Sequence, residues 1–383
     1  MSKHPVETES RHATGEDRSE GIATTIGVQL MRLGAALIVP IVTFFLLVVS
    51  FQYLRSTDAN RLIVSAVAIL VGVFGVWGVF WGMDLVVNQL PSRFRERVRP
   101  AAFVGPAVVF LGIFLVYPAI NTVNLAFRDR AGQEFVGFEN FVYLFTNESP
   151  LIAIRNSIVW VVIVPLVTVA IGLAFATMVD KLGRRAESVS KSMIFLPMAI
   201  SLVGASIVWR FVYDFRPPGF GEQIGLLNAV WTGLGSDPMA WLQQQPWNNL
   251  FLMVIVVWLQ TGFAMVILSS AIKAVPTDIL EAARIDGASE WKVFSRVVFP
   301  AISSTVVVVL TTVVLFVWKT FDIVWVMTGG RFRTQVVAQQ MVTEFFTFRN
   351  NGRGAALAVV MFVAVVPVMY LNVRKFREQE QTR

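Results

Sequence analysis

The sequence contains no cysteine and only two histidines, His4 and His12, both in the polar stretch before the first apolar run. Without cysteine there can be no disulfide, thiolate nucleophile or sulfur-ligated metal. Charged residues are also scarce, at 15% of 383 residues. These absences exclude most familiar catalytic constellations, so we expect no catalytic residue and no metal site on this chain.

Apolar residues, by contrast, make up 55% of the chain, which is more than a soluble domain usually carries. A protein inside a lipid bilayer must satisfy its backbone polar groups internally, so it crosses as helices or as a closed barrel. The apolar runs here are much longer than barrel strands and do not alternate with polar residues. The predicted fold class is therefore an all-α polytopic membrane protein.

The predicted spans follow from apolar runs near the ~20 residues that a helix needs to cross a bilayer. Eight such runs are present, at Gly27–Phe51, Leu62–Trp81, Phe103–Asn121, Ser157–Val179, Met193–Tyr213, Leu250–Ser270, Ala301–Val326 and Ala355–Leu371.

The lysines and arginines predict how these spans are oriented. If the polar tail 1–26 is cytoplasmic, most of the 32 basic residues lie on the same side, including the loops with Arg93–Arg99 and Lys181–Lys191. This excess is the pattern of a cytoplasmic face, so both termini are predicted to be cytoplasmic. The net charge of +7 then indicates orientation rather than nucleic-acid binding. The longer outer loops carry Trp231, Trp241 and Trp247, which we interpret as interfacial anchors.

The segment 274–300 is charged, although it separates two apolar spans, and it falls on the predicted cytoplasmic side. Pro276 and Thr277 form a helix start with Asp278 in the first turn, and this helix should run to about Asp286. Gly287 can take the left-handed conformation that ends a helix. The segment thus predicts a helix followed by a glycine turn.

A second helix should follow that turn, capped by Ser289 and closed at the membrane by Pro300. It would carry Trp291, Phe294 and Val298 on one face. In the first helix, Glu281 and Arg284 are spaced to form an ion pair. Two capped helices with an apolar face framed by charge favour docking into the groove of another protein. The alternative is an amphipathic hairpin that lies on lipid headgroups.

The string Glu281-Ala282-Ala283, with Gly287 and the ending Val297-Val-Phe-Pro300, resembles the coupling motif of permease subunits of binding-protein-dependent ABC importers. The longer string 274–289 is similar to the carbohydrate branch, which includes maltose-type permeases. Further stretches resemble that branch, namely 138–145, 155–157, 258–263, 321–322, 327–330 and 354–356. Arg331-Phe332 departs from it, because family members more often continue with glycine or proline.

This resemblance implies a six-helix type I permease core at 101–383, with the two helices of 27–100 as an addition. It also implies a bacterial or archaeal plasma membrane, a second permease subunit, a cytoplasmic ATPase dimer and an extracytoplasmic solute-binding protein. The chain has no phosphate-binding loop, so ATP and Mg are expected on the ATPase and no cofactor on this chain. The residues implied in ATPase coupling are Glu281, Ala282, Ala283, Arg284, Asp286, Gly287, Trp291, Phe294 and Pro300.

Polar side chains inside spans are costly in lipid and usually face a bundle interior or a water-filled cavity. The candidates for a substrate path are Gln260, Thr261, Trp318, Lys319, Thr320 and Asp322. Lys319 and Asp322 are three residues apart and could pair on one helix face. An equally weighted alternative is that this pair lies at the outer membrane boundary as a structural ion pair.

The predicted function is thus the permease subunit of an ATP-driven importer for a sugar, such as an oligosaccharide or an α-glucoside of the maltose or trehalose kind. Alternatives within the class are permeases for polyamines, amino acids or glycerol phosphate. An ion-coupled secondary transporter is less favoured, since no inverted repeat or charged midplane residue is evident. A membrane enzyme would need a cluster of His, Asp or Glu near the membrane face, and the sequence shows none, so this class is not favoured.

Overall fold

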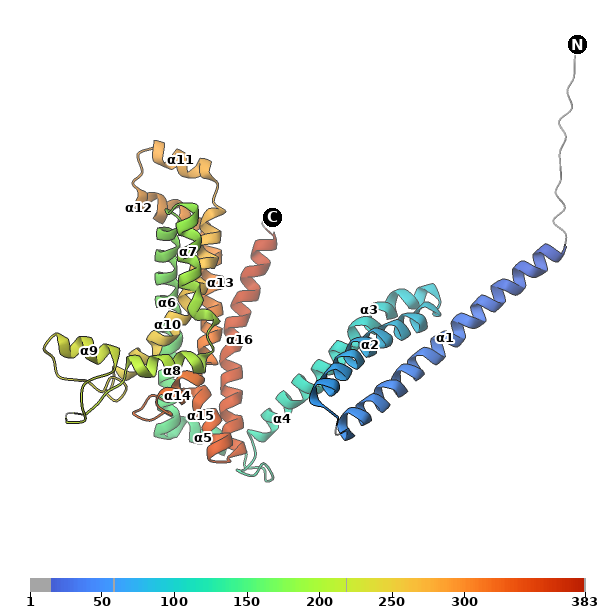
Figure 1. Ribbon diagram of the computed structural model, residues 1–383, viewed down its shortest axis with the longest axis horizontal. Helices are drawn as coiled ribbons and strands as arrows, with labels where there is room; N and C mark the ends of the chain where they lie inside the picture. Colours follow the sequence, from blue (N-terminus) through green and yellow to red (C-terminus); the bar gives the residue numbers. More distant parts are fainter. Residues whose placement is uncertain (1–14, 58, 218, 382–383) are drawn as a thin grey trace, which may run out of the picture. The chain divides into compact units, whose positions relative to one another are not determined.

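The computed structural model describes residues 15–57, 59–217 and 219–381. Within these ranges the chain is helical, and its strand-like pairing is an isolated bridge between Arg128 and Phe135. Seven helices are long and apolar enough to cross a membrane, or eight if one bent pair forms a span. The all-α polytopic architecture is confirmed. The chain divides into two compact units, Met1–Pro118 and Ala119–Arg383 (Figure 1); the predicted domain division near residue 100 stays a prediction.

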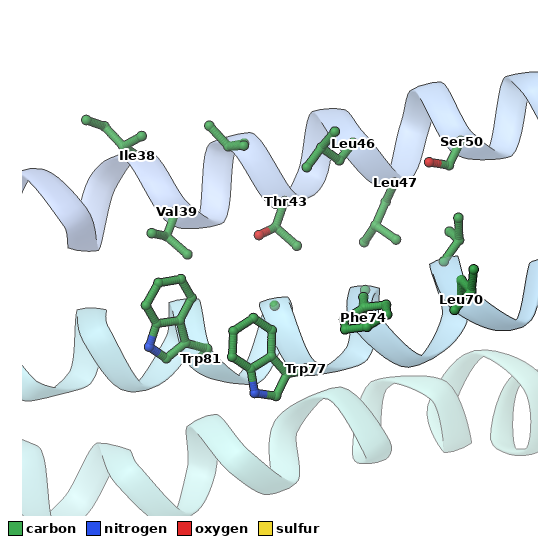
Figure 2. Close-up of a pocket in the computed structure, with 14 residues that line it drawn as sticks. Ile38, Val39, Thr43, Leu46, Leu47, Ser50, Leu70, Phe74, Trp77 and Trp81 are labelled. Atoms are coloured by element: carbon green, nitrogen blue, oxygen red, sulfur yellow. The ribbon is translucent and has the colours of Figure 1, made fainter. Parts of the chain in front are cut away.

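In the first unit a face of small residues brings two helices together. Gly75, Gly78 and Gly82 of α2 are buried against α1. A Cβ added at Gly78 would lie 3.0 Å from Thr43, so the missing side chains allow the close approach that membrane helices use for packing. Figure 2 shows Thr43 and Leu47 of α1 pointing toward α2. The helices of this unit are α1 (Gly15–Ser56), α2 (Arg61–Asn88), α3 (Ser92–Leu111) and the π-helix η1 (Gly112–Val116).

Helix α1 begins at Gly15 and so includes part of the predicted polar tail 1–26, whose assignment stays a prediction; residues 1–14 lie outside the described residues. One expectation for this region needs correction. The arginines of Arg93–Arg99 lie on the first turns of α3 rather than in a loop. Arginine has a high helix propensity and Pro91 stands at the cap position, so the helix forms before the apolar run begins.

The chain enters the second unit through α4 (Tyr117–Leu125). The helices that follow are α5 (Glu139–Thr146), α6 (Glu148–Val179), α7 (Arg184–Phe195), η2 (Leu196–Ala199), α8 (Leu202–Val212), α9 (Leu226–Gly233), α10 (Asn248–Lys273), α11 (Thr277–Ile285), α12 (Glu290–Val293), η3 (Phe294–Val298), α13 (Phe299–Trp318), α14 (Asp322–Met327), α15 (Val337–Val342), η4 (Thr343–Thr347) and α16 (Asn351–Gln381). Helices α11 and α12 lie at one end of this unit, and α5, α14 and α15 lie at the other (Figure 1).

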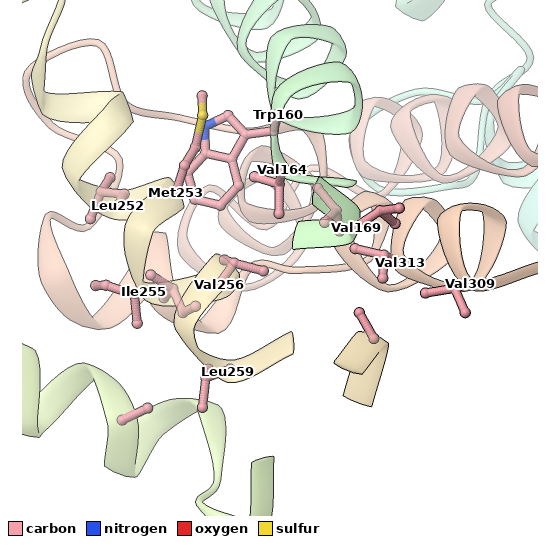
Figure 3. Close-up of a cluster of buried hydrophobic side chains, with 14 of the residues drawn as sticks. Trp160, Val164, Val169, Leu252, Met253, Ile255, Val256, Leu259, Val309 and Val313 are labelled. Carbon is pink, nitrogen blue, oxygen red and sulfur yellow. The ribbon is translucent and has the colours of Figure 1, made fainter. Parts of the chain in front are cut away.

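Helix α10 is the central helix of this unit. Of its most apolar stretch, 56% is buried within the chain, against 33% for α6 and 22% for the span that contains α13. The main core comes from α6, α10 and α13, including Trp160, Leu252, Val256 and Val313 (Figure 3). Most of its side chains are aliphatic and three are aromatic, namely Trp160, Tyr213 and Trp241, so the packing depends on shape. The expected anchor Trp241 joins this core and is only 6% exposed, so its assignment to the membrane interface was wrong.

The predicted span Met193–Tyr213 is not one helix. The chain bends by 101° between 184–199 and 202–212. Pro197 lies in the 3-10 turn at this break, Ile200 is extended, and Ser201 starts a new helix by accepting a hydrogen bond from the Gly204 N–H at 3.1 Å. Proline cannot continue an α-helical ladder and serine favours a helix start, so two local signals act within an apolar run.

The predicted span Ala301–Val326 is also divided. Helix α13 ends at Trp318, and α14 begins at Asp322 after three non-helical residues. Thr320 is 3% exposed, and its hydroxyl donates back to the Phe316 carbonyl at 3.0 Å. The separate α14 packs against α8.

Glycines set the distance between α10 and its neighbours. A Cβ on Gly262 would lie 2.5 Å from the Ile194 carbonyl oxygen and 2.7 Å from the Phe195 Cα, which are backbone atoms of the bent span. We expect Gly262→Ala to destabilise the protein by about 1–3 kcal/mol, because backbone atoms cannot move aside as a side chain can. Thermal unfolding of the purified protein measures this. Gly233→Ala is the matched control, since nothing lies within 4 Å of that position; equal losses in both variants would contradict the packing argument.

A buried carboxyl lies at the end of the unit opposite α11. Glu344 is 1% exposed and accepts a hydrogen bond from the Gln340 amide at 3.3 Å. Burial raises the pKa of its carboxyl above the ordinary 4.5, and the positive charges of Arg353 and Arg130 oppose this rise. Between pH 4.5 and the higher pKa of the folded state, the Glu344 carboxyl is therefore protonated in the folded chain and ionised in the unfolded chain.

The stability that this proton confers is present below pH 4.5 and is lost as the pH rises through the folded-state pKa. Glu344→Gln cannot ionise, so it should flatten the fall in melting temperature above that pH, measured by thermal unfolding across a pH series. Glu222→Gln, at an exposed position, should leave the profile unchanged. A wild-type profile that Glu344→Gln does not alter would show that this carboxyl plays no part in it.

Candidate functional site

The segment 274–300 forms the predicted pair of helices. Helix α11 covers Thr277–Ile285, with Pro276 at its cap position, and α12 begins at Glu290. Gly287 between them has φ +79°, and nothing lies within 4 Å of the position that a Cβ would take. The glycine is therefore required by backbone conformation and not by crowding.

One face of this segment is held by the bundle while the other is open. Val275, Val293, Val298 and Ile302 form a buried cluster, against which Leu280, Ala283 and Phe294 pack. The remaining implied coupling residues are exposed, and these are Glu281, Ala282, Arg284, Asp286, Gly287, Trp291 and Pro300. Ile285 and Trp291 are 85% and 73% exposed. Large apolar side chains are thus presented outward from an anchored scaffold.

The charges of the segment pair differently from the prediction. Arg284 bonds to the Glu290 carboxylate at 2.9 and 3.4 Å, whereas the expected pair with Glu281 is not formed. This contact joins α11 to α12 across the glycine turn, and Glu290 raises the pKa of the Arg284 guanidinium. Because the turn brings Glu290 beside Arg284, the guanidinium can reach it with two nitrogens.

Two residues that were predicted to begin or end the second helix behave differently in the structure. Ser289 stands at the cap position of α12, but its side chain makes no capping hydrogen bond. Pro300 does not end the helix, since 290–318 forms one continuous helical stretch. The π-helix Phe294–Val298 lies just before this proline, and such a local adjustment accommodates a missing N–H.

A groove of about 700 Å³ separates this segment from α6. Trp291, Phe294 and Val298 all line it, as their predicted common face requires, and Leu280 adds to the apolar wall. The lining also includes charged residues, namely Asp180, Lys181, Arg284 and Glu290. The groove can therefore accept an apolar side chain within a charged surround.

Ion pairs join three helix ends beside this groove. The Lys273 ammonium lies 2.5 Å from the Glu187 carboxylate and 3.3 Å from Asp180, the latter without hydrogen-bond geometry. Glu187 also pairs with Lys191 at 2.6 Å. Lys273 ends α10, Asp180 follows α6 and Glu187 lies on α7, so one network holds these helices together.

The six candidate path residues do not form one polar cluster. Lys319 and Asp322 do not pair, because the helix breaks between them, and Lys319 is exposed. Trp318 donates its indole N–H to the Met361 carbonyl of α16 at 3.0 Å, and Thr320 is satisfied on its own helix. Both side chains thus serve packing in this structure.

Gln260 and Thr261 remain as polar groups within α10. Each is 6% exposed. The Thr261 hydroxyl donates to the Val257 carbonyl at 2.6 Å, while the Gln260 amide has no hydrogen-bond partner among the described residues. The Gln260 amide can therefore form hydrogen bonds with a ligand or a second subunit.

Thr261 lines an aromatic pocket of about 380 Å³ that sequence reasoning missed. Trp209 of α8 and Trp258 of α10 face it, with ring centroids 5.8 Å apart, and Pro197 belongs to its wall. Aromatic faces with a few polar groups are typical of small-molecule sites. Both tryptophans lie inside apolar runs, and their aromatic character is the signal that could have pointed to this pocket.

Comparison with known proteins decides the class of molecule. Residues 167–374 match the family described as binding-protein-dependent transport system inner membrane components. The chain belongs to this family. It is therefore a transport permease rather than an enzyme, and the resemblance in the sequence is confirmed.

Two relatives of the permease are similar over most of its length. One is the osmoprotective compounds uptake permease protein GgtC of Synechocystis sp., which is 50% identical over 73% of this chain and 100% of its own. The other is the alpha-glucoside transport system permease protein AglF of Rhizobium meliloti, 41% identical over 82% of this chain and 97% of its own.

A solved structure shares the fold. It is a bacterial alginate ABC transporter in complex with a periplasmic protein that holds an alginate pentasaccharide. The similarity has a TM-score of 0.64 and covers 75% of this chain and 98% of the other, at 21% identity. At that identity the similarity shows that the two chains share a fold.

Proposed function

We propose that this permease imports an α-glucoside or a related glycoside, in an assembly with a second permease, an ATPase dimer and an external solute-binding protein. The observation that carries the proposal is the similarity to an α-glucoside permease across 82% of the chain. The relative named for osmoprotective compounds makes an osmoprotective compound the second candidate substrate.

In this proposal α11 and α12 are the coupling segment. They face the cytoplasm, where the ATPase lies, and both termini are on the same side. The support is their geometry: the segment is anchored by Leu280 and Ala283, and it presents Ile285 and Trp291 to solvent. An exposed apolar pair on a fixed scaffold is what a partner groove requires.

The lipid-headgroup alternative places the same apolar face in the bilayer surface. It would bring Ile285 and Trp291 into contact with acyl chains and needs no partner protein. The two readings differ in one measurable respect, because only docking makes the loss of an exposed side chain weaken the association with an ATPase.

Ile285→Ser removes an exposed apolar side chain that the proposal buries against the ATPase. We expect about tenfold or greater loss of ATPase association, since burying such a side chain contributes about 1.5–3 kcal/mol. The measurement is titration of the ATPase onto the permease in nanodiscs. Ile224→Ser is the matched control, because Ile224 is 57% exposed and lies outside the segment 274–300. Undiminished association in Ile285→Ser would favour the headgroup reading.

Uptake of labelled α-glucosides in the native host tests the substrate. Removing this chain should abolish the uptake of maltose- or trehalose-like solutes and leave polyamine and amino-acid uptake intact. Gln260→Ala and Asp322→Ala should also abolish uptake while the complex still assembles, because they remove polar groups from the proposed path.

Gln243→Ala and Asp237→Ala, at exposed positions, provide the controls for these two variants. Uptake that persists in Gln260→Ala or Asp322→Ala removes that residue from the path. Glycoside uptake that is independent of the chain overturns the substrate assignment.

A further inference from the structure

A polar pocket lies at the end of the second unit opposite α11, where α6 and α10 begin. Its volume is about 580 Å³, and its lining includes Arg155, Trp247, Asn249 and Arg333. Trp247 is 60% exposed. The pocket is separate from the segment proposed for coupling and from the aromatic pocket at Thr261.

Three asparagine side chains hold one wall of this pocket in place. Asn156, 4% exposed, donates to the carbonyls of Arg333 and Gln335 at 2.8 and 2.9 Å. Asn248, fully buried, donates to the Phe332 carbonyl at 2.8 Å. Asn249 accepts from the Trp160 indole at 3.1 Å and lies 3.4 Å from the Arg333 carbonyl. Buried amides aimed at one turn fix the backbone of that turn.

The turn itself has an unfavourable conformation. Phe332 and Arg333 have φ values of +59° and +60°, which side chains with a Cβ rarely adopt. Such residues persist only where the surrounding structure determines them, and they gather at functional sites. Here the hydrogen bonds from the asparagine amides hold the turn in this conformation, and the turn places the Arg333 side chain at the pocket.

The side chains of the pocket suit a sugar ring. Arg155 and Arg333 offer several N–H donors to hydroxyl or carboxylate oxygens, and Trp247 offers an aromatic face to the apolar side of a pyranose. Arg333 is paired with Glu148 at 2.8 Å, but both side chains are largely exposed, at 46% and 73%. An exposed pair of this kind contributes little, so a ligand can compete for the guanidinium.

The pocket also leads toward the aromatic pocket described above. Leu250 and Met253 line the polar pocket, while Val254, Val257 and Thr261 line the aromatic pocket. Steps of three and four residues place all five on one face of α10. The two pockets therefore follow one another along a single helix face.

We propose that the pocket of Arg155, Trp247 and Arg333 is a subsite that receives a glycosyl unit before it passes along α10. The inference rests on the proposed function, since it names where the glycoside of that importer first meets this chain. The ring stacks on Trp247 and its oxygens accept hydrogen bonds from the two guanidiniums.

Saturation-transfer NMR of methyl α-glucoside against the whole complex in nanodiscs tests the subsite directly. Trp247→Ala should lower the transfer signal at least threefold, Trp247→Phe should retain most of it, and Phe220→Ala, at a 75% exposed position, should not change it. An unchanged signal in both Trp247→Ala and Arg155→Gln would overturn the proposal.

Uptake by proteoliposomes with the binding protein gives the second readout. We expect Trp247→Ala and Arg155→Gln to raise the half-saturating concentration at least fivefold while the affinity for the binding protein stays the same. If that affinity falls instead and the NMR signal persists, the pocket is a protein-docking site and the proposal is wrong. A wild-type complex that imports no glycoside disproves the proposed function, and the NMR comparison still decides the subsite.

Discussion

Close packing of backbone against backbone along α10 is the constraint on which the second unit depends. A Cβ on Gly172 of α6 would lie 2.7 Å from Ala264 Cβ and 3.1 Å from the Met265 nitrogen. On another side of α10, Gly262 allows the backbone of the bent span to approach equally closely. In a bilayer the lipid is as apolar as the core, so helices associate through such close van der Waals contact rather than through hydrophobic burial. The pockets and the ion-pair network take their positions from these contacts.

Much of the fold could be predicted because its physical causes are local. Long apolar runs require helices in lipid, and Gly287 between two capped stretches requires a turn. The breaks at Pro197 and after Trp318 could not be obtained in the same way. Hydropathy averages over a run and does not register one proline or one buried threonine, so the local signals at Pro197 and Ser201 are lost in the average. Trp241 shows the same limit, since burial of an aromatic residue in a loop is decided by the fold of that loop.

Some features of the candidate site could likewise be predicted from the sequence, whereas others depend on the fold. The motif located the segment of α11 and α12, because its spacing is a property of the chain alone. The partner of Arg284 depended on the turn, which carries Glu290 to the guanidinium and leaves Glu281 exposed. Lys319 and Asp322 have the spacing of a helical pair, yet α13 ends at Trp318 and a new helix begins at Asp322, so no helix aligns them. The aromatic pocket escaped notice because Trp209 and Trp258 meet only once the chain has bent.

A single rigid element joins the two ends of the proposed mechanism. Helix α10 carries both pockets on one face, and its last residue, Lys273, is four positions before α11 begins. Through Glu187 and Asp180 the same lysine holds the ends of α7 and α6. In the proposed mechanism a displacement of α11 would act on three helix ends together, and α7 leads directly to the bend at Pro197 that walls the aromatic pocket. Close glycine contacts cannot compress, so the core would pass such a displacement on as movement of whole helices.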